Sequence, residues 1–239
     1  TLVEDRGYDV NNPLWGSVPF VLDGGFEAVL DLHRAYVRAG ADLIIANTHN
    51  ASLKSCADYG ARGFPVESEA RALVIDAPGA KPDLALLEFV NRRAVEAARQ
   101  AARPDTRVAA GLMSPDRAYA RTATLDADRI EAGLINQARA LDALGVALVF
   151  EMISTDADVE GVAQVLPKLR SPVGVGFTCG ADARTHGGVD PAAAARRLTD
   201  AGATAVFIQC THFDHVLAPL RRVVDVVDPR AVTVGAYAN

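Results

Sequence analysis

Short runs of apolar residues alternate with longer amphipathic stretches along this chain. Each run is nearly continuous, without regular polar interruptions, and this pattern is typical of strands buried on both faces of a parallel sheet. The sequence therefore predicts six strands, at residues 41–47, 107–112, 146–152, 173–178, 204–210 and 231–237.

The stretches between these runs have the 3.6-residue spacing of helices. Residues 84–102 carry an apolar stripe formed by Leu87, Val90, Ala94, Ala97 and Ala101. Residues 126–144 carry another, formed by Ile130, Leu134, Ala138 and Leu141. Gly145 follows this second segment directly, as expected where a helix ends and the next strand begins.

Strand and helix together form a repeated unit, and six such units are visible. A (β/α)8 barrel needs eight, whereas an open doubly wound sheet is complete with six. No Gly-x-Gly-x-x-Gly turn follows a predicted strand, which argues against a dinucleotide-binding fold. Residues 67–83 are polar and contain Pro78 and Pro82, so we expect an inserted loop there and a single domain over residues 1–239.

Composition excludes several classes of function. The 239 residues are half hydrophobic and carry a formal net charge of −6, so there is no basic surface for nucleic acid. We find no apolar run of the roughly 20 residues that a membrane span needs, and no signal peptide. The three cysteines do not resemble a disulfide framework, which predicts a reducing cytoplasm. Whether the chain forms homo-oligomers is left open.

Reactive side chains gather just after the predicted strands, where α/β proteins place their active sites. Cys210 ends an apolar run, and His212 follows it. Glu151 stands inside another apolar run, and a buried carboxylate there needs a partner, which indicates ligand binding. A cluster of thiols and imidazoles favours either a zinc site or a nucleophilic cysteine with His212 as its base.

Several segments together resemble the homocysteine S-methyltransferase family, which includes the betaine and S-methylmethionine enzymes and the homocysteine domain of cobalamin-dependent methionine synthase. The matching segments are residues 6–15 (RGYDVNNPLW), 32–42 (LHRAYVRAGAD), 46–52 (ANTHNAS), 150–152 (FEM), 209–211 (QCT) and 237–239 (YAN). These segments follow the order and spacing of the family, and together they extend over nearly the whole chain. The resemblance implies a (β/α)8 TIM barrel that binds zinc through three cysteines.

The resemblance also implies roles for single residues. Cys210 would be a zinc thiolate, Glu151 would bind the amino group of homocysteine, and both would be catalytic residues. The implied substrate-binding residues are Trp15, Asn47, Thr48, Glu151, Thr178 and Asn239. Trp15 would lie near the donor methyl group and Asn239 beside the metal. Cys179 has no zinc role in the family pattern, so it is either packing beside the site or a substitute ligand.

The family's adjacent pair of zinc cysteines, after its eighth strand, has no match before Asn239. We therefore expect the visible strands to be the second to the seventh, with the first and last strands and the remaining zinc cysteines outside this chain. A degenerate barrel without zinc is the alternative.

The function expected from the resemblance is zinc-dependent methyl transfer to the thiol of homocysteine, which gives methionine. Met152 stands where the betaine enzymes carry tyrosine, and the run at residues 11–15 is closer to the S-methylmethionine type. A small sulfonium donor is therefore favoured over an ammonium donor. The alternatives are a metal-free enzyme of another class that uses Cys210 and His212, and a non-catalytic barrel.

Overall fold

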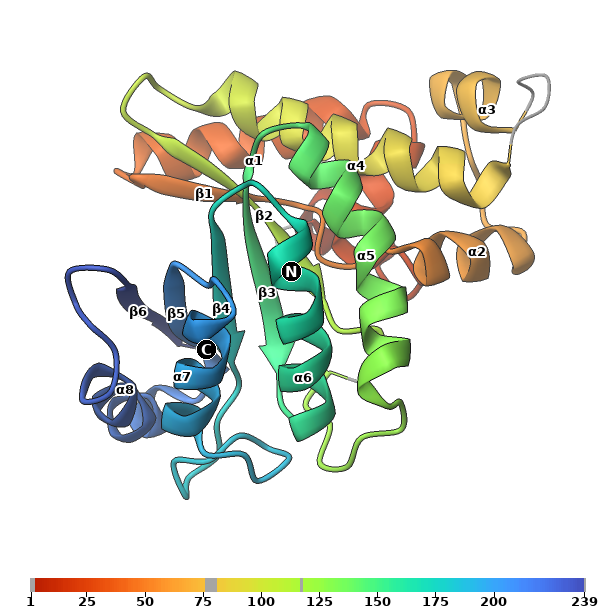
Figure 1. The fold of residues 1–239 in the computed structure, drawn as a ribbon. Helices are drawn as coiled ribbons and strands as arrows, with labels where there is room; N and C mark the ends of the chain where they lie inside the picture. Colours follow the sequence, from red (N-terminus) through yellow and green to blue (C-terminus); the bar gives the residue numbers. More distant parts are fainter. Residues whose placement is uncertain (1–2, 76–80, 117, 239) are drawn as a thin grey trace. The chain divides into compact units, whose positions relative to one another are not determined.

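The computed structural model describes residues 3–75, 81–116 and 118–238 of the chain. Within this part, six strands alternate with helices, and the strand pairs described below are all parallel. The protein therefore has an α/β fold, as the sequence predicts (Figure 1).

The chain divides into two compact units. The first consists of Thr1–Leu112 and Arg139–Val146, and the second of Met113–Ala138 and Ala147–Asn239. Helix α5 (Ala127–Ala143) contributes residues to both.

The first unit is a helical layer with two strands. Its strands are β1 (Leu43–Ala46) and β2 (Arg107–Met113, whose last residue belongs to the second unit), paired in parallel with Leu43 opposite Arg107. Its helices are η1 (Glu4–Arg6), η2 (Trp15–Val21), α1 (Gly25–Arg38), α2 (Leu53–Ala61), α3 (Ser68–Val74) and α4 (Pro82–Ala101). Helix α4 packs against α1, α2, α3 and β1, and its predicted apolar stripe is buried.

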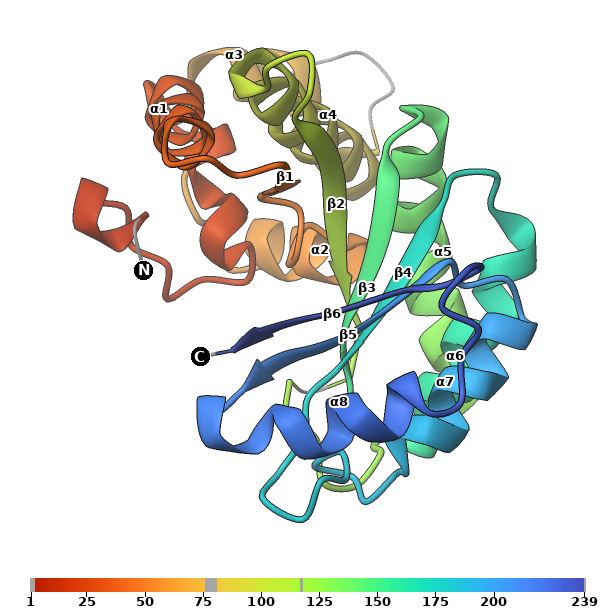
Figure 2. The same ribbon diagram turned by 90° about the vertical axis from the view of Figure 1, so that its left-hand side faces the viewer.

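The second unit holds a parallel sheet in the chain order β3 (Ala147–Ile153), β4 (Val173–Phe177), β5 (Ala205–Thr211) and β6 (Thr233–Ala238). The remaining helices are α6 (Asp156–Val165), η3 (Leu166–Lys168), α7 (Pro191–Asp200), η4 (Phe213–His215) and α8 (Leu217–Val224). Helices α6, α7 and α8 follow one another along one side of these strands (Figure 2).

Glycines on two strands make room for large side chains of β5. A Cβ on Gly174 would lie 2.8 Å from the ring of Phe207, and one on Gly235 would lie 3.2 Å from it. A Cβ on Gly176 would collide with the side-chain amide of Gln209. Phe207 and Gln209 therefore lie across the neighbouring strands, where any larger residue would displace them.

The six predicted strands are all present, and their ends differ from the prediction by at most two residues. The prediction of a loop over residues 67–83 is wrong in part, because Ser68–Val74 form α3 and Pro82 begins α4. Proline breaks a helix interior but is favoured in the first turn, where its missing N–H costs nothing. Helix α3 is held by packing against α4 and η2. Residues 76–80, with Pro78, lie outside the described residues.

In the described part of the chain, no helix has the length and apolarity that a membrane span requires.

Candidate active site

Glu151 is placed by an irregularity in β3. The strand is otherwise apolar, and Glu151 is only 9% exposed. The pairing with β4 shifts between Phe150 and Ile153, and Met152 has a φ of 65°. A bulge re-aims the side chains beside it, and a non-glycine residue in the left-handed region is strained.

Strand β5 has the same irregularity at Cys210. Its pairing with β6 shifts between Gln209 and Thr211, and Cys210 has a φ of 44°. Cys210 is partly exposed, whereas the flanking Gln209 and Thr211 are buried. Backbone strain of this kind concentrates at functional sites, and here it occurs on two strands of one sheet, beside the two predicted catalytic residues.

Glu151 belongs to a hydrogen-bonded group that spans the sheet from β3 to β6. The hydroxyl of Tyr237 donates to Oε1 of Glu151 at 2.6 Å and also contacts the side-chain oxygen of Gln209. Burial, and then the charge of Glu151, raises the pKa of Tyr237 well above its usual value. Tyr237 therefore keeps its proton and remains a hydrogen-bond donor at any physiological pH.

The thiol of Cys210 is not activated by its protein surroundings. Burial raises its pKa, and the charge of Glu151 raises it further, while a hydrogen bond with Tyr119 acts in the opposite direction. A nucleophilic cysteine needs a lowered pKa and a nearby imidazole.

His212, the predicted base, is 57% exposed. Its ring stacks on Phe213, and Nδ1 lies 3.6 Å from Oδ2 of Asp214. His212 is therefore engaged with its own loop, which does not favour the Cys210–His212 pair.

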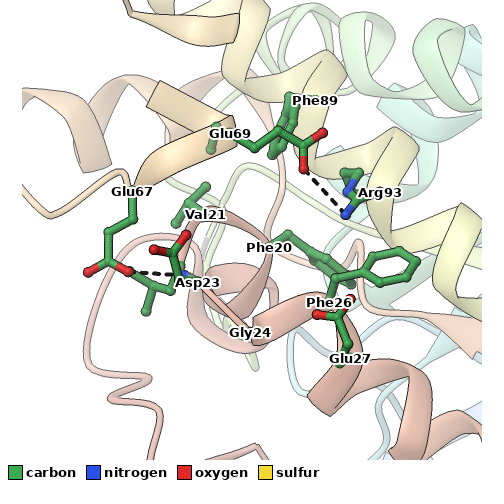
Figure 3. Close-up of a pocket in the computed structure, with 12 residues that line it drawn as sticks. Phe20, Val21, Asp23, Gly24, Phe26, Glu27, Glu67, Glu69, Phe89 and Arg93 are labelled. Carbon is green, nitrogen blue, oxygen red and sulfur yellow. Dashed lines mark hydrogen bonds and ion pairs between the residues drawn. The ribbon is translucent and has the colours of Figure 1, made fainter. Parts of the chain in front are cut away.

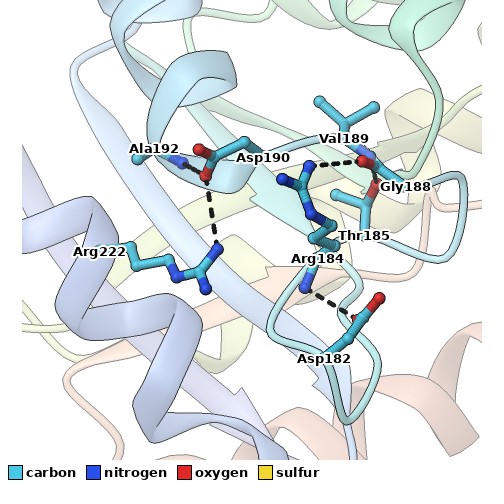
Figure 4. Close-up of polar contacts among 8 residues, drawn as sticks. All are labelled: Asp182, Arg184, Thr185, Gly188, Val189, Asp190, Ala192 and Arg222. Carbon is cyan, nitrogen blue, oxygen red and sulfur yellow. Dashed lines mark hydrogen bonds and ion pairs between the residues drawn. The ribbon is translucent and has the colours of Figure 1, made fainter.

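The loop after β4 carries Thr178 and Cys179, and polar contacts within the loop and with α8 hold it in place (Figure 4). Arg184 donates to the carbonyl of Gly188 at 2.9 Å, and Arg222 of α8 lies 4.0 Å from Oδ1 of Asp190. Thr178 is fully buried, and its Oγ1 has no hydrogen-bond partner among the described residues.

The ring of His186, within this loop, meets the ring of Tyr119 edge to face, with centroids 5.4 Å apart. Burial and the charge of Arg121 lower the pKa of His186. Tyr119, which is 44% exposed and has a φ of 58°, thus links the Cys210 thiol to the β4 loop.

The first unit brings together its own predicted residues. Asn47 Nδ2 donates to the carbonyl of Gly16 at 3.3 Å, and Thr48 Oγ1 donates to the carbonyl of Gly111 at 2.8 Å. Trp15 is 41% exposed, and its ring lies 5.9 Å from that of His49. The residues directly after β1 are thus fixed against the segment that carries Trp15.

The first unit also contains a cavity of about 150 Å³, and none of the predicted site residues line it (Figure 3). Arg93 lies 4.0 Å over the ring of Phe26 and 3.5 Å from a carboxylate oxygen of Glu69. The N–H of Asp23 donates to Glu67 at 3.0 Å. These contacts tie α1, α3 and α4 together.

The described residues do not by themselves complete a metal site. Among them, no three His, Cys, Asp or Glu side chains are grouped closely enough to hold a metal ion. Cys210 offers one partly exposed thiol. Cys179 is buried, its pKa is raised to about 12, and its N–H donates to Thr211 Oγ1, all of which fits packing better than metal binding.

Three residues near Glu151 and Cys210 were given no role by the sequence analysis: Gln209, Tyr237 and Tyr119. Gln209 stands in an apolar run as Glu151 does, and the same reasoning could have found it. Tyr119 gave no signal, since aromatic residues in loops are common. Asn239 lies outside the described residues.

Comparisons with known proteins identify the family of the chain and a similar fold. A family model described as homocysteine S-methyltransferase matches residues 1–239. The fold is similar to that of the homocysteine methyltransferase MmuM from Escherichia coli in its metallated and oxidized forms. In both cases the TM-score is 0.77 at 18% sequence identity, over 99% of this chain and 87% of the other. For the apo form the TM-score is 0.68, with 77% of that chain covered. A search of curated proteins finds no match.

Proposed function

Since the chain belongs to the homocysteine S-methyltransferase family and is a methyltransferase, we propose that it transfers a methyl group from a small sulfonium donor of the S-methylmethionine type to the thiol of homocysteine, giving methionine. The observation that carries this proposal is the nearly buried carboxylate of Glu151 beside the Cys210 thiol, with both on bulged strands.

Glu151 would hold the α-ammonium group of homocysteine. A carboxylate that is largely removed from water forms a strong charge-assisted hydrogen bond with a cationic amine. This contact would fix the amino acid end of the substrate and leave its thiol chain directed along the site. Holding both substrates in line replaces a collision in solution by a reaction between positioned groups.

The chemical step balances without an added oxidant or reductant. Homocysteine loses its thiol proton, and its sulfur forms the new S–CH3 bond. The donor's S–CH3 bond breaks, and its electron pair remains on the donor sulfur, which becomes a neutral thioether. The thiol proton passes to solvent and carries the positive charge of the sulfonium with it, so both sulfur products are neutral thioethers.

We propose zinc as the cofactor, with Cys210 as one of its ligands and the remaining ligands outside the described residues. When bound, zinc would stabilise the thiolate form of a coordinated thiol at neutral pH. The solved structure of MmuM in a metallated form supports a metal in this family, although it does not identify the metal.

Trp15 supports a cationic methyl donor. Its indole is 41% exposed, and an aromatic face attracts a sulfonium by a cation–π interaction. Asn47, Thr48, Thr178 and Asn239 complete the proposed substrate-binding residues. We further propose that the six strands are the second to the seventh of a (β/α)8 barrel. The chain order of β3 to β6 supports this, since a doubly wound sheet reverses its order.

We also propose that the protein acts in a reducing cytoplasm, as the number and spacing of the cysteines in the sequence predict.

The proposal is tested on the full-length protein by assaying methionine formation from homocysteine and S-methylmethionine, with zinc content measured on the same sample. We expect about one zinc per chain. Cys210→Ser should lose both zinc and turnover, whereas Cys56→Ser, which alters a buried thiol of the first unit, should keep both. Full activity and zinc in Cys210→Ser would overturn the assignment.

Glu151→Gln should raise the KM for homocysteine about 30-fold, because a hydrogen bond to a charged group is replaced by a neutral one. The KM for the methyl donor should change much less. An unchanged KM for homocysteine would remove Glu151 from the binding site.

A further inference from the structure

Tyr237 reaches Glu151 across two intervening strands. Tyr237 lies on β6 and Glu151 on β3, with β4 and β5 between them in the sheet. The hydroxyl of Tyr237 nevertheless donates to Oε1 of Glu151 at 2.6 Å. Because this bond joins the two ends of the four-stranded sheet, the direction of the carboxylate depends on β6.

The tyrosine side chain is itself held in place. Its ring lies 6.3 Å from that of Phe207, and its hydroxyl contacts the amide of Gln209, which is fully buried. The Gln209 amide also donates to the carbonyl of Gly176 at 3.4 Å. The ring is therefore held by packing, and its hydroxyl lies against a second polar side chain.

A carboxylate in this setting has capacity beyond the bond from Tyr237. Its two oxygens offer about four acceptor sites, and a hydroxyl donor occupies one. Unlike a lysine or arginine, the neutral hydroxyl of Tyr237 adds no positive charge beside the carboxylate, so this bond does not weaken the attraction of Glu151 for an ammonium group. A neutral donor therefore fixes the orientation of the carboxylate and does not compete with an ammonium group for its negative charge.

We propose that Tyr237 is a positioning residue, which orients the Glu151 carboxylate toward the α-ammonium group of homocysteine and so selects thiol acceptors that carry an amino group. This inference rests on the proposed function. Gln209 lies one step further away and limits the position of the Tyr237 hydroxyl by contact.

The test compares two acceptors in steady-state methyl transfer by the full-length protein. Homocysteine carries the amino group, and 4-mercaptobutanoate has the same thiol and carboxylate without it. Tyr237→Phe keeps the ring and removes the hydroxyl. We expect its KM for homocysteine to rise about tenfold with kcat within about twofold of wild type, as for loss of one hydrogen bond to a charged group. With 4-mercaptobutanoate, kcat/KM should be unchanged.

A matched control separates positioning from general stability. Tyr59 is 1% exposed and donates its hydroxyl to the carbonyl of Pro65 at 2.7 Å, in the first unit. Tyr59→Phe removes a comparable bond and should change neither acceptor's kinetics. Gln209→Met has a side chain of similar length without the amide. Its KM for homocysteine should rise less than that of Tyr237→Phe, again with no change for 4-mercaptobutanoate. This variant provides the test if Tyr237→Phe does not fold.

The outcomes are distinct. Equal losses with both acceptors would show that Tyr237 only supports the fold, and no loss with either would show that it does not position Glu151, so both results overturn the inference. A wild-type protein that does not methylate homocysteine at all would instead overturn the proposed function. A loss confined to homocysteine supports the inference.

Discussion

His33 makes the stability of the protein depend on mild acid. It lies in α1 and is 5% exposed, and its Nε2 has no hydrogen-bond partner among the described residues. Burial lowers its pKa from 6.5 to about 4. The imidazole is therefore neutral in the folded state at pH values where it is already protonated in the unfolded chain.

The direction of the effect follows from proton binding. Between pH 6.5 and about 4 the unfolded chain binds more protons at this site than the folded chain, so acid favours unfolding. The stabilisation is complete above pH 6.5 and is lost as the pH falls through about 4. The full difference corresponds to about 3 kcal/mol, of which about 2 kcal/mol is lost between pH 7 and pH 4.5.

The assay is urea unfolding of wild type and His33→Leu at several pH values from 7 to 4.5. Carboxylates titrate in both proteins, so the difference between them isolates the histidine. His33→Leu should lose about 2 kcal/mol less than wild type over this range. Parallel curves for His33→Leu and wild type would refute the reasoning.

Three further predictions concern the reactivity of the thiols, a contact between two helices and a buried carboxylate. Maleimide labelling of the native, metal-depleted protein should modify Cys210 first, because Cys56 and Cys179 are buried and their pKa values are raised to about 12; peptide mapping gives the order. Gly161→Ala should lower the free energy of unfolding, measured with urea, by about 1–3 kcal/mol, since the new Cβ would lie 2.6 Å from the side chain of Ile130. Asp158→Asn should cost about 2–4 kcal/mol, because this carboxylate accepts bonds from two backbone N–H groups and two hydroxyls.

Each has its own control. Gly60→Ala in α2 meets only one atom, at 3.9 Å, and should be neutral or stabilise by up to about 1 kcal/mol, as the helix propensity of alanine predicts. A Gly161→Ala variant as stable as Gly60→Ala would contradict the predicted collision with Ile130. Labelling of Cys56 at the rate of Cys210 would contradict the burial argument. A loss below about 0.5 kcal/mol in Asp158→Asn would be typical of a surface site.

The strands were predictable because buried parallel strands leave a nearly uninterrupted apolar signal. Val146 to Ile153 is such a run, and its single carboxylate marks the site. Helix α3 was missed although its residues Ser68–Val74 (SEARALV) include several good helix formers, because prolines follow it and the whole stretch was taken as one loop. Its local preference and its packing against α4 both favour the helix.

The details of the site depend on register, which the sequence does not show. Met152 and Cys210 have a left-handed backbone conformation, which usually requires glycine. Because neither residue is glycine, the sequence does not indicate either bulge. The contact between Tyr237 and Glu151 joins residues 86 positions apart and requires the order of four strands. The strand pattern identified Glu151 and Cys210 as candidates and the resemblance gave them roles, whereas the contact of Tyr237 with Glu151 required the structure.

The space above Gly176 has a consequence for how relatives of this protein can diverge. Any side chain at this position would collide with Gln209, so a larger residue is tolerated only where position 209 becomes smaller. A smaller residue at 209 would in turn release the hydroxyl of Tyr237. Positions 151, 176, 209 and 237 should therefore covary across homologous sequences. Lineages that changed one of them are expected to have changed the others, together with the acceptor they use.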